Sequence, residues 1–400
     1  MARSLPGGRR LAAALASTAA LALALTGCAG GSSGSSGSSA SGGSSAGSYK
    51  VGFVLQLSGT GSVYAETSQA GQKAALADVN KKKTAGTTFT STTADAGADA
   101  QSATTACSRL VQQEKVQALV AFVPGPQLLA CNTVASRLHV PLLSLSSGAG
   151  NICAANLTSY GLVPNQQTLP VIDTLLKQGK KKWYFFGADY STPKATISLA
   201  KPYVTSHGGT VVGESYEPLG TADYSQDITN IVNARPDVAF LNVVGNDDVA
   251  LQKQWAADPR TKGIARVDIL LGEGSAHALG AAAAGIWSSN VYFSSISGSG
   301  NSDFKAAVKS AGLSGSPDIN SYVSYLQVQA LAHAVKKGGS SGDKVIAALK
   351  QTDFAGPVGT FQIHKGFSYQ PVYLAQAGSD GSFSIQKKSD PVEPQTTCGS

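Results

Sequence analysis

The sequence predicts an α/β protein of two lobes, each a mostly parallel sheet flanked by helices. From residue 49 onward, short apolar runs alternate with helix-length segments, a rhythm typical of βαβ units. The chain has 400 residues, of which 42% are hydrophobic and 14% charged, so it can bury a large core and wholesale disorder is excluded. A single core rarely exceeds about 250 to 300 residues, which predicts two lobes.

The first 27 residues have the pattern of an export signal. Basic residues precede an apolar run over 11–25, which is shorter than the roughly 20 residues that a membrane-spanning helix needs. Leu-Thr-Gly-Cys at 25–28 resembles a bacterial lipobox, in which Cys28 is acylated. We therefore expect a signal peptide over 1–27 and attachment to the outer face of the cell membrane through Cys28. The alternative is ordinary cleavage that leaves a free thiol.

The segment after the lipobox predicts a spacer. Residues 28–48 are almost entirely Gly, Ser and Ala after Cys28, a composition typical of a flexible tether. Removing the signal peptide with its three arginines lowers the formal charge from +7 to +4. No basic face is visible in what remains, so nucleic acid is not an expected partner.

Six apolar runs from residue 50 onward are predicted to be buried strands. A helix is expected after the first of them, where Ala70, Ala74 and Ala77 recur at helical spacing. Ligands of parallel sheets bind beyond the carboxyl ends of the strands, so the site is expected in the loops that follow the runs. The runs are 50–55, 118–122, 141–144, 183–186, 238–241 and 269–271.

Four cysteines remain beside Cys28, and export favours their oxidation. Cys107, Cys131, Cys153 and Cys398 allow three pairings that sequence does not choose between. Our expectation is Cys131 with Cys153, because both should lie near strand-to-helix loops of one lobe; the alternative is that some stay reduced and buried. The five histidines lack ligand spacing, so neither a metal nor a cofactor is expected.

The loops after the strands suit binding better than bond breaking. Gly125, Ser146, Ser147 and Gly148 offer hydroxyl and backbone N–H groups at predicted helix starts, a setting for an anion such as a carboxylate. Glu273, between two glycines, suits an ammonium or amide group. Taken singly, each serine is better explained as a helix cap. Gly59–Tyr64 lacks the third glycine of a dinucleotide fingerprint, so nucleotide binding is not expected.

Several segments, in order, resemble the branched-chain amino acid (leucine/isoleucine/valine) binding proteins of ABC importers. They include Tyr49–Gly59, Ala74–Asn80 and Gly179–Tyr190, followed by segments 208–214, 218–225 and 236–238. Phe354–Phe361 is similar to a Gly-Pro-x-Gly segment of urea- and amide-binding relatives. The resemblance covers nearly all of 49–390.

The resemblance implies the periplasmic-binding-protein type I fold, whose lobes are joined by three hinge crossings. We place the crossings near Val163, Ser295 and Gly359. The first lobe would then contain 49–163 and 296–358, and the second 164–295 and 359–398, the last stretch including a hinge hairpin. The lobes would close over a ligand in the cleft.

The resemblance also implies roles for individual residues. Tyr64 would be a cleft tyrosine, Ser146 would hold an α-carboxylate through its backbone, and Glu273 would receive an α-ammonium. Tyr325 would line the side-chain pocket, and Asp189 with Tyr190 would contribute from the second lobe. Gly125 and Gly148 stand where the family has Ser and Thr. Two hydroxyl donors are therefore missing, and amide, urea-like or aromatic-acid ligands stay open beside amino acids.

The function expected from these residues is a monomeric, lipid-anchored receptor that delivers a small polar metabolite to an ABC permease. A ligand-sensing ectodomain that acts with a separate signalling partner is the alternative, disfavoured because no transmembrane segment follows Ser400. An extracellular hydrolase would need a nucleophile, a base and an acid that converge in the cleft. No histidine follows a predicted strand, so an enzyme is not expected.

Overall fold

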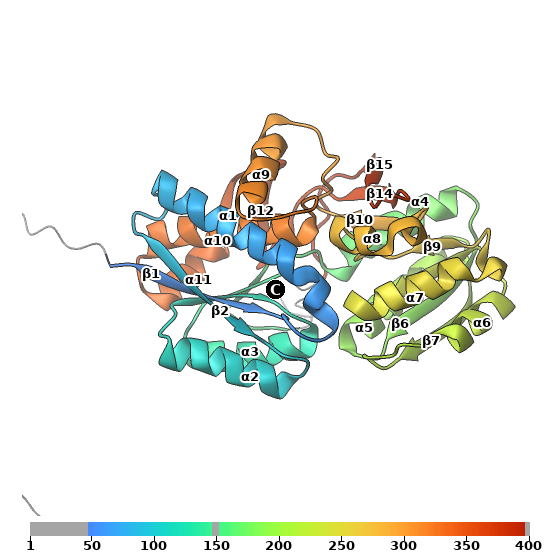
Figure 1. Cartoon of the computed structure of the whole chain (residues 1–400), viewed down its shortest axis with the longest axis horizontal. Coiled ribbons are helices and arrows are strands. Elements are labelled where there is room, and N and C mark those ends of the chain that lie inside the picture. The colour runs from blue at the N-terminus through green and yellow to red at the C-terminus, as the bar shows by residue number, and fades with distance from the viewer. Residues whose placement is uncertain (1–46, 146–151, 397–400) are drawn as a thin grey trace, which may run out of the picture. The chain divides into compact units, whose positions relative to one another are not determined.

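The computed structural model describes residues 47–145 and 152–396. Two sheets, each mostly parallel and flanked by helices, organise this part of the chain (Figure 1), which confirms the predicted fold class. In the described residues, every helix falls short of the length or the hydropathy that a membrane span requires.

The first lobe is built on an eight-stranded sheet in the order β11-β12-β13-β5-β4-β3-β1-β2. Strand β1 lies between β2 and β3 and is parallel to both. The strands are β1 (Tyr49–Leu55), β2 (Phe89–Asp95), β3 (Ala118–Phe122), β4 (Leu142–Ser144), β5 (Leu157–Ser159), β11 (Asp353–Gly356), β12 (Gly359–His364) and β13 (Phe367–Tyr369).

Helices cover both faces of this sheet. In Figure 1, α2 and α3 lie below it and α1 and α10 above. The buried residues of β1 alternate between the two faces: Val54 packs with α2 and α3, and Phe53 with α1, as expected for a strand covered on both sides. The helices are α1 (Ala65–Lys82), α2 (Ala100–Ser108), α3 (Gly125–Arg137), α9 (Ser299–Ser310), α10 (Ile319–Gly338) and α11 (Gly342–Leu349), with the 3₁₀ turn η1 (Thr60–Tyr64) before α1.

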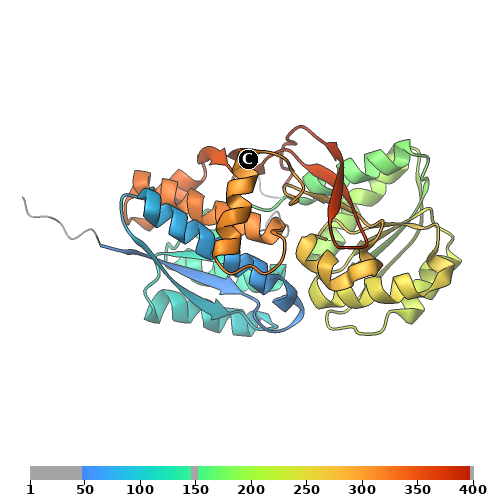
Figure 2. The same ribbon diagram turned by 45° about the horizontal axis from the view of Figure 1, so that its top comes forward.

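The second lobe is built on a seven-stranded sheet in the order β15-β14-β10-β9-β8-β6-β7. Its strands are β6 (Lys182–Ala188), β7 (Thr210–Glu217), β8 (Val238–Asn242), β9 (Ala265–Val267), β10 (Trp287–Asn290), β14 (Tyr373–Ala377) and β15 (Phe383–Lys388). Its helices are α4 (Pro164–Lys177), α5 (Ser191–Ser206), α6 (Ser225–Asn233), α7 (Gly245–Ala257) and α8 (Glu273–Leu279). The antiparallel pair of β14 and β15, in red in Figure 2, forms one edge of this sheet.

The chain passes between the two sheets three times. The passages lie between β5 and α4, between β10 and α9, and between β13 and β14. The third passage corrects our placement near Gly359: β12 and β13 pair with the first sheet, through Phe367 beside Ser159, so the chain changes lobe only at 370–372.

One predicted strand is wrong. Residues 269–271 form no strand, because Asp268 ends β9 in a turn in which its carboxylate accepts the backbone N–H of Leu270 at 2.9 Å. A side chain that captures a nearby N–H competes with the ladder in this way. The segment instead belongs to the loop after the strand, and Leu270 lines a pocket.

The disulfide prediction is also wrong. Cys131 pairs with Cys107, with their Cα atoms 5.5 Å apart. Both residues lie inside helices, Cys107 in α2 and Cys131 in α3, and these helices pack side by side on one face of the first sheet. Cys153, which we had paired with Cys131, is itself disulfide-bonded.

Candidate functional site

A pocket lies where the two lobes meet, and both lobes line it. It encloses about 860 Å³, part of which is open to solvent. The first lobe contributes residues after the ends of β1, β3 and β4 together with the start of α10. The second contributes α4, β10 and the segments after β6, β8 and β9. The pocket therefore lies beyond the carboxyl ends of the parallel strands, as such sheets predict.

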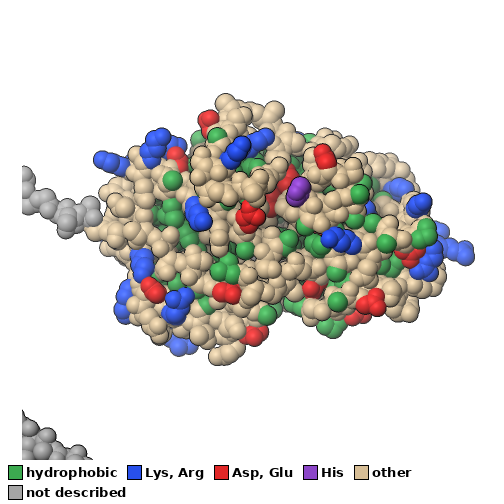
Figure 3. Space-filling view, in the orientation of Figure 1, with side chains coloured by type: hydrophobic (Ala, Val, Ile, Leu, Met, Phe, Trp, Pro, Cys, Tyr) green, Lys and Arg blue, Asp and Glu red, His purple; other side chains and the backbone are tan. Residues whose placement is uncertain are grey.

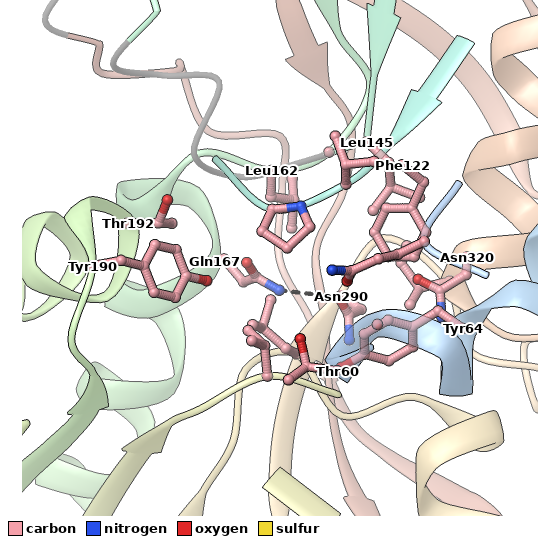
Figure 4. Close-up of a pocket in the computed structure, with 18 residues that line it drawn as sticks. Thr60, Tyr64, Phe122, Leu145, Leu162, Gln167, Tyr190, Thr192, Asn290 and Asn320 are labelled. Atoms are coloured by element: carbon pink, nitrogen blue, oxygen red, sulfur yellow. Dashed lines mark hydrogen bonds between the residues drawn. The ribbon is translucent and has the colours of Figure 1, made fainter. Parts of the chain in front are cut away.

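Aromatic and aliphatic side chains form most of the pocket wall (Figure 4). The rings of Tyr64 and Phe122 lie 5.4 Å apart and are tilted by 52°. Tyr190 approaches from the second lobe (Figure 4). The remaining apolar lining residues are Val123, Pro124, Leu145, Leu162, Val244, Leu270 and Ile319.

The polar lining is neutral. It consists of hydroxyl and amide side chains, and among the described residues no Asp, Glu, Lys, Arg or His lines the pocket. Burial raises the pKa values of Tyr64 and Tyr190, so both phenols stay protonated at physiological pH. The polar side chains are Gln56, Thr60, Gln167, Thr192, Asn290 and Asn320.

Gln167 holds the second-lobe side of the pocket in shape. The two hydrogens of its Nε2 group are shared among three acceptors: the carbonyl oxygens of Ile269 at 2.5 Å and Ser289 at 2.9 Å, and Asn290 Oδ1 at 3.0 Å. The bond to Asn290 is the dashed line in Figure 4. One buried amide thus ties the start of α4 to β10 and to the loop after β9.

Gly125 and Thr192 face each other across the cleft. Gly125 begins α3, and a Cβ atom placed on it would lie 3.1 Å from Thr192 Oγ1. The N–H groups in the first turn of a helix have no partner within the helix. The start of α3 and the Thr192 hydroxyl therefore offer donors to the same side of the pocket.

The structure brings together only some of the predicted site residues. Tyr64 and Tyr190 line the pocket, and Gly125 borders it beside the lining residue Pro124. Asp189 does not line it; its exposed carboxylate pairs with Lys194. Ser146, Ser147 and Gly148 lie outside the described residues, directly after the lining residue Leu145.

Tyr325 and Glu273 also lie away from the pocket lining. The Tyr325 hydroxyl donates to Asp78 Oδ2 at 2.9 Å, which joins α10 to α1 within the first lobe. Glu273 is buried at the start of α8 and accepts the N–H of Ser294. The ammonium-binding role that the family resemblance implies for Glu273 has no support in this geometry.

The sequence analysis missed several lining residues. Thr192 lies just beyond the predicted Asp189–Tyr190 pair and could have been found by extending that loop. Leu162, Gln167 and Asn320 belong to the crossings and to helix starts. No local pattern marks them, because only the packing of the two lobes brings them to the pocket.

Comparison with known proteins identifies the family. A model of the family described as periplasmic binding protein matches residues 48–382. The chain belongs to this family. Its proteins bind solutes outside the cytoplasmic membrane and work with ABC transporters, which makes this chain a solute-binding receptor.

Solved structures of similar fold come from several bacteria. A solute binding protein of an ABC transporter from R. palustris, in complex with benzoate, is 21% identical with a TM-score of 0.79 over 88% of this chain and 99% of its own. An amino acid ABC transporter substrate-binding protein from Pseudomonas fluorescens is 17% identical with a TM-score of 0.77, over 88% and 99%. A leucine binding protein from Thermotoga maritima is 18% identical with a TM-score of 0.73, over 86% and 99%. At these identities the similarity shows the fold alone.

Proposed function

We propose that this receptor captures a small ring-bearing solute, an aromatic acid or aromatic amide, and delivers it to an ABC permease. The observation that carries the proposal is the pocket wall: Tyr64, Phe122 and Tyr190 converge on it from both lobes, and its described lining bears no ionisable group other than these phenols. Aromatic side chains favour stacked or edge contacts with a flat ring. A pocket of mostly apolar wall with a few placed polar groups is typical of small-molecule sites.

The same lining disfavours an α-amino acid. A buried ammonium group needs an anionic partner to offset its desolvation. No carboxylate lines the described pocket, and Glu273 lies outside it. This supports the aromatic-acid and amide alternatives over the branched-chain amino acids that the family resemblance suggests.

The polar end of the ligand would lie against the start of α3. Thr192 supplies a hydroxyl there. Its Oγ1 lies only 3.1 Å from the position that a Cβ atom on residue 125 would occupy, and Gly125 has no Cβ atom. A carboxylate or carbonyl oxygen suits the free N–H groups and the positive end of the helix dipole. The ring would then lie between Phe122 and Tyr190.

The receptor role involves no covalent chemistry and suits anchoring at the membrane. Export through the signal peptide and acylation of Cys28 would hold the lobes near a permease. On the visible face, Lys and Arg side chains are spread over both lobes and interspersed with Asp and Glu (Figure 3), which does not favour nucleic acid as a partner. A ligand-sensing ectodomain would use the same pocket, and the identity of the membrane partner separates the two roles.

A ligand panel tests the proposed class. We would measure the melting temperature of the purified chain, residues 49–400, with benzoate, 4-hydroxybenzoate, benzamide, L-phenylalanine and L-leucine. Binding to the folded form alone stabilises it by about 2.7 kcal/mol at 100 times the Kd. We expect stabilisation by one of the three compounds without an ammonium group, and loss of it in Tyr190→Ala. Stabilisation by L-leucine alone would overturn the ligand class while leaving the receptor role in place.

A further inference from the structure

Two buried carboxyl groups from opposite lobes lie close together beside the pocket. Glu273, the first residue of α8, is 2% exposed, and Asp318, the residue before α10, is 1% exposed. A Cβ atom placed on Gly274 would lie 2.9 Å from Asp318 Oδ2. The start of α8 in the second lobe is therefore in contact with the start of α10 in the first.

The two carboxyl groups differ in their hydrogen-bond partners. Asp318 caps α10: its Oδ1 accepts the N–H of Ser321 at 2.9 Å, and its Oδ2 accepts Asn320 Nδ2 at 3.0 Å. Glu273 Oε1 accepts the N–H of Ser294 at 2.5 Å, whereas Oε2 is buried with no partner among the described residues. Both oxygens of the Asp318 carboxyl therefore accept a hydrogen bond, although burial raises its pKa, whereas only one oxygen of Glu273 has a partner among the described residues.

No described cation forms an ion pair with Glu273. Lys305 on α9 reaches the same segment but donates to the carbonyl oxygen of Ser294 at 3.2 Å.

Tyr292, between β10 and α9, is the other titratable group that interacts with both carboxyls. On α7, which packs against α8, the buried acid Asp248 interacts with Asp268 and Arg266 instead. His277, the remaining titratable group of α8, is exposed.

An ionised carboxylate in this place is costly. A buried charge without a partner is strongly disfavoured, and the group takes up a proton instead. Burial, with a smaller contribution from the charge of Asp318, raises the pKa of Glu273 from 4.5 to about 8. A proton on Oε2 makes that atom a donor and removes the repulsion between the two carboxylates.

We propose that Glu273 is a positioning residue for lobe closure, which carries a proton when the lobes are closed and opposes closure when it loses that proton. The residue acts through the junction of α8 with α10 rather than through contact with the ligand. Closure is then linked to pH through this pair of carboxyl groups, whichever solute the pocket takes.

The direction of the pH effect follows from linkage. When the lobes separate, the Glu273 carboxyl gains water and its pKa returns toward 4.5. The closed form therefore holds one more proton than the open form between about pH 4.5 and 8, and closure weakens as the pH rises through this window. Above pH 8 the stabilisation from the proton is lost.

The experiment compares wild type, Glu273→Gln, Asp318→Asn and the exposed control Asp353→Asn without ligand. Glutamine imitates the protonated acid, and Asn is as good a helix cap as Asp. For each variant, the radius of gyration from small-angle scattering and the melting temperature are measured between pH 5 and 9.

We expect wild type and Asp353→Asn to expand with rising pH and to lose roughly 3 to 6 °C of melting temperature relative to Glu273→Gln. Glu273→Gln should stay compact over the whole range. Asp318→Asn should show a smaller change than wild type, because one of the two charges is gone. Parallel pH profiles for wild type and Glu273→Gln would overturn the proposal, whatever the ligand panel shows.

Discussion

The backbone N–H of Gly245 donates a hydrogen bond to the hydroxyl oxygen of Tyr64 at 2.7 Å, and this bond joins the two lobes beside the pocket. Gly245 begins α7 in the second lobe, and Tyr64 ends η1 in the first. The next residue, Asn246, donates through Nδ2 to Ser62 Oγ at 3.1 Å and to the Gly59 carbonyl at 3.3 Å. The turn that supplies Thr60 and Tyr64 to the pocket is thus held by the lobe opposite.

Replacing Gly245 with Ala should prevent full closure. A Cβ atom at this position would lie 1.9 Å from the carbonyl oxygen of Thr60, and the residue has φ of 64°. We expect the affinity for the panel compound that binds wild type best to fall at least tenfold in calorimetry. Gly263→Ala is the matched control, because Gly263 also has a positive φ, of 89°, but no atom lies within 4 Å of its Cβ position. Equal losses in both variants would show that backbone strain, not the lobe contact, is responsible.

Tyr64→Phe should weaken binding without removing the ring from the pocket wall. The substitution deletes the acceptor of the Gly245 N–H and keeps the contact with Phe122. An unpaired buried N–H costs about 1 to 3 kcal/mol. Affinity should therefore fall by roughly 5- to 150-fold, mainly through faster dissociation in stopped-flow measurements. An unchanged dissociation rate would mean that the bond does not help to hold the closed form.

Gln167→Leu should destabilise the second lobe and distort the pocket. The carbonyl oxygens of Ile269 and Ser289 and the side chain of Asn290 would lose their shared donor. We expect the free energy of unfolding in urea to fall by about 2 to 4 kcal/mol. Gln178→Leu, at an exposed position after α4, is the control and should change it by less than about 0.5 kcal/mol. A loss of the same size in both variants would contradict the role given to Gln167.

Removing the Cys107–Cys131 disulfide should destabilise the first lobe. The bond closes a loop with a sequence separation of 24, for which the chain-entropy relation gives about 3.5 kcal/mol. The double variant Cys107→Ala/Cys131→Ala leaves the other cysteines in place and should unfold at lower urea concentration. Equal unfolding midpoints for wild type and double variant would show that the bond contributes no net stability.

The sheets were predictable where strands are buried on both faces. The runs at 183–186 and 238–241 appear as parts of β6 and β8 because central parallel strands read as continuous apolar segments. Strand β2 was missed because it is a Thr-rich edge strand with exposed positions. Residues 269–271 have the same apolar composition as a strand, but the turn at Asp268 decides their conformation.

The pocket was predictable in its position and only partly in its residues. Tyr64 and Tyr190 were named through the family resemblance, and both lie in the segments that follow β1 and β6, where the strand-end rule places the site. Glu273 follows the same rule but is turned into the junction of α8 with α10. Sequence spacing does not distinguish a loop residue that enters the cleft from one that enters the contact between lobes.

The sequence by itself determined the α/β class and the presence of two lobes, because these depend on the period and length of apolar runs, which are local properties of the chain. Tertiary structure alone decided that Cys107 pairs with Cys131, that β12 and β13 join the first lobe, and that Gly245 meets Tyr64. Each of these joins residues far apart in the sequence. Such contacts depend on how whole elements pack in three dimensions, and no local pattern encodes which of several compatible partners a residue meets.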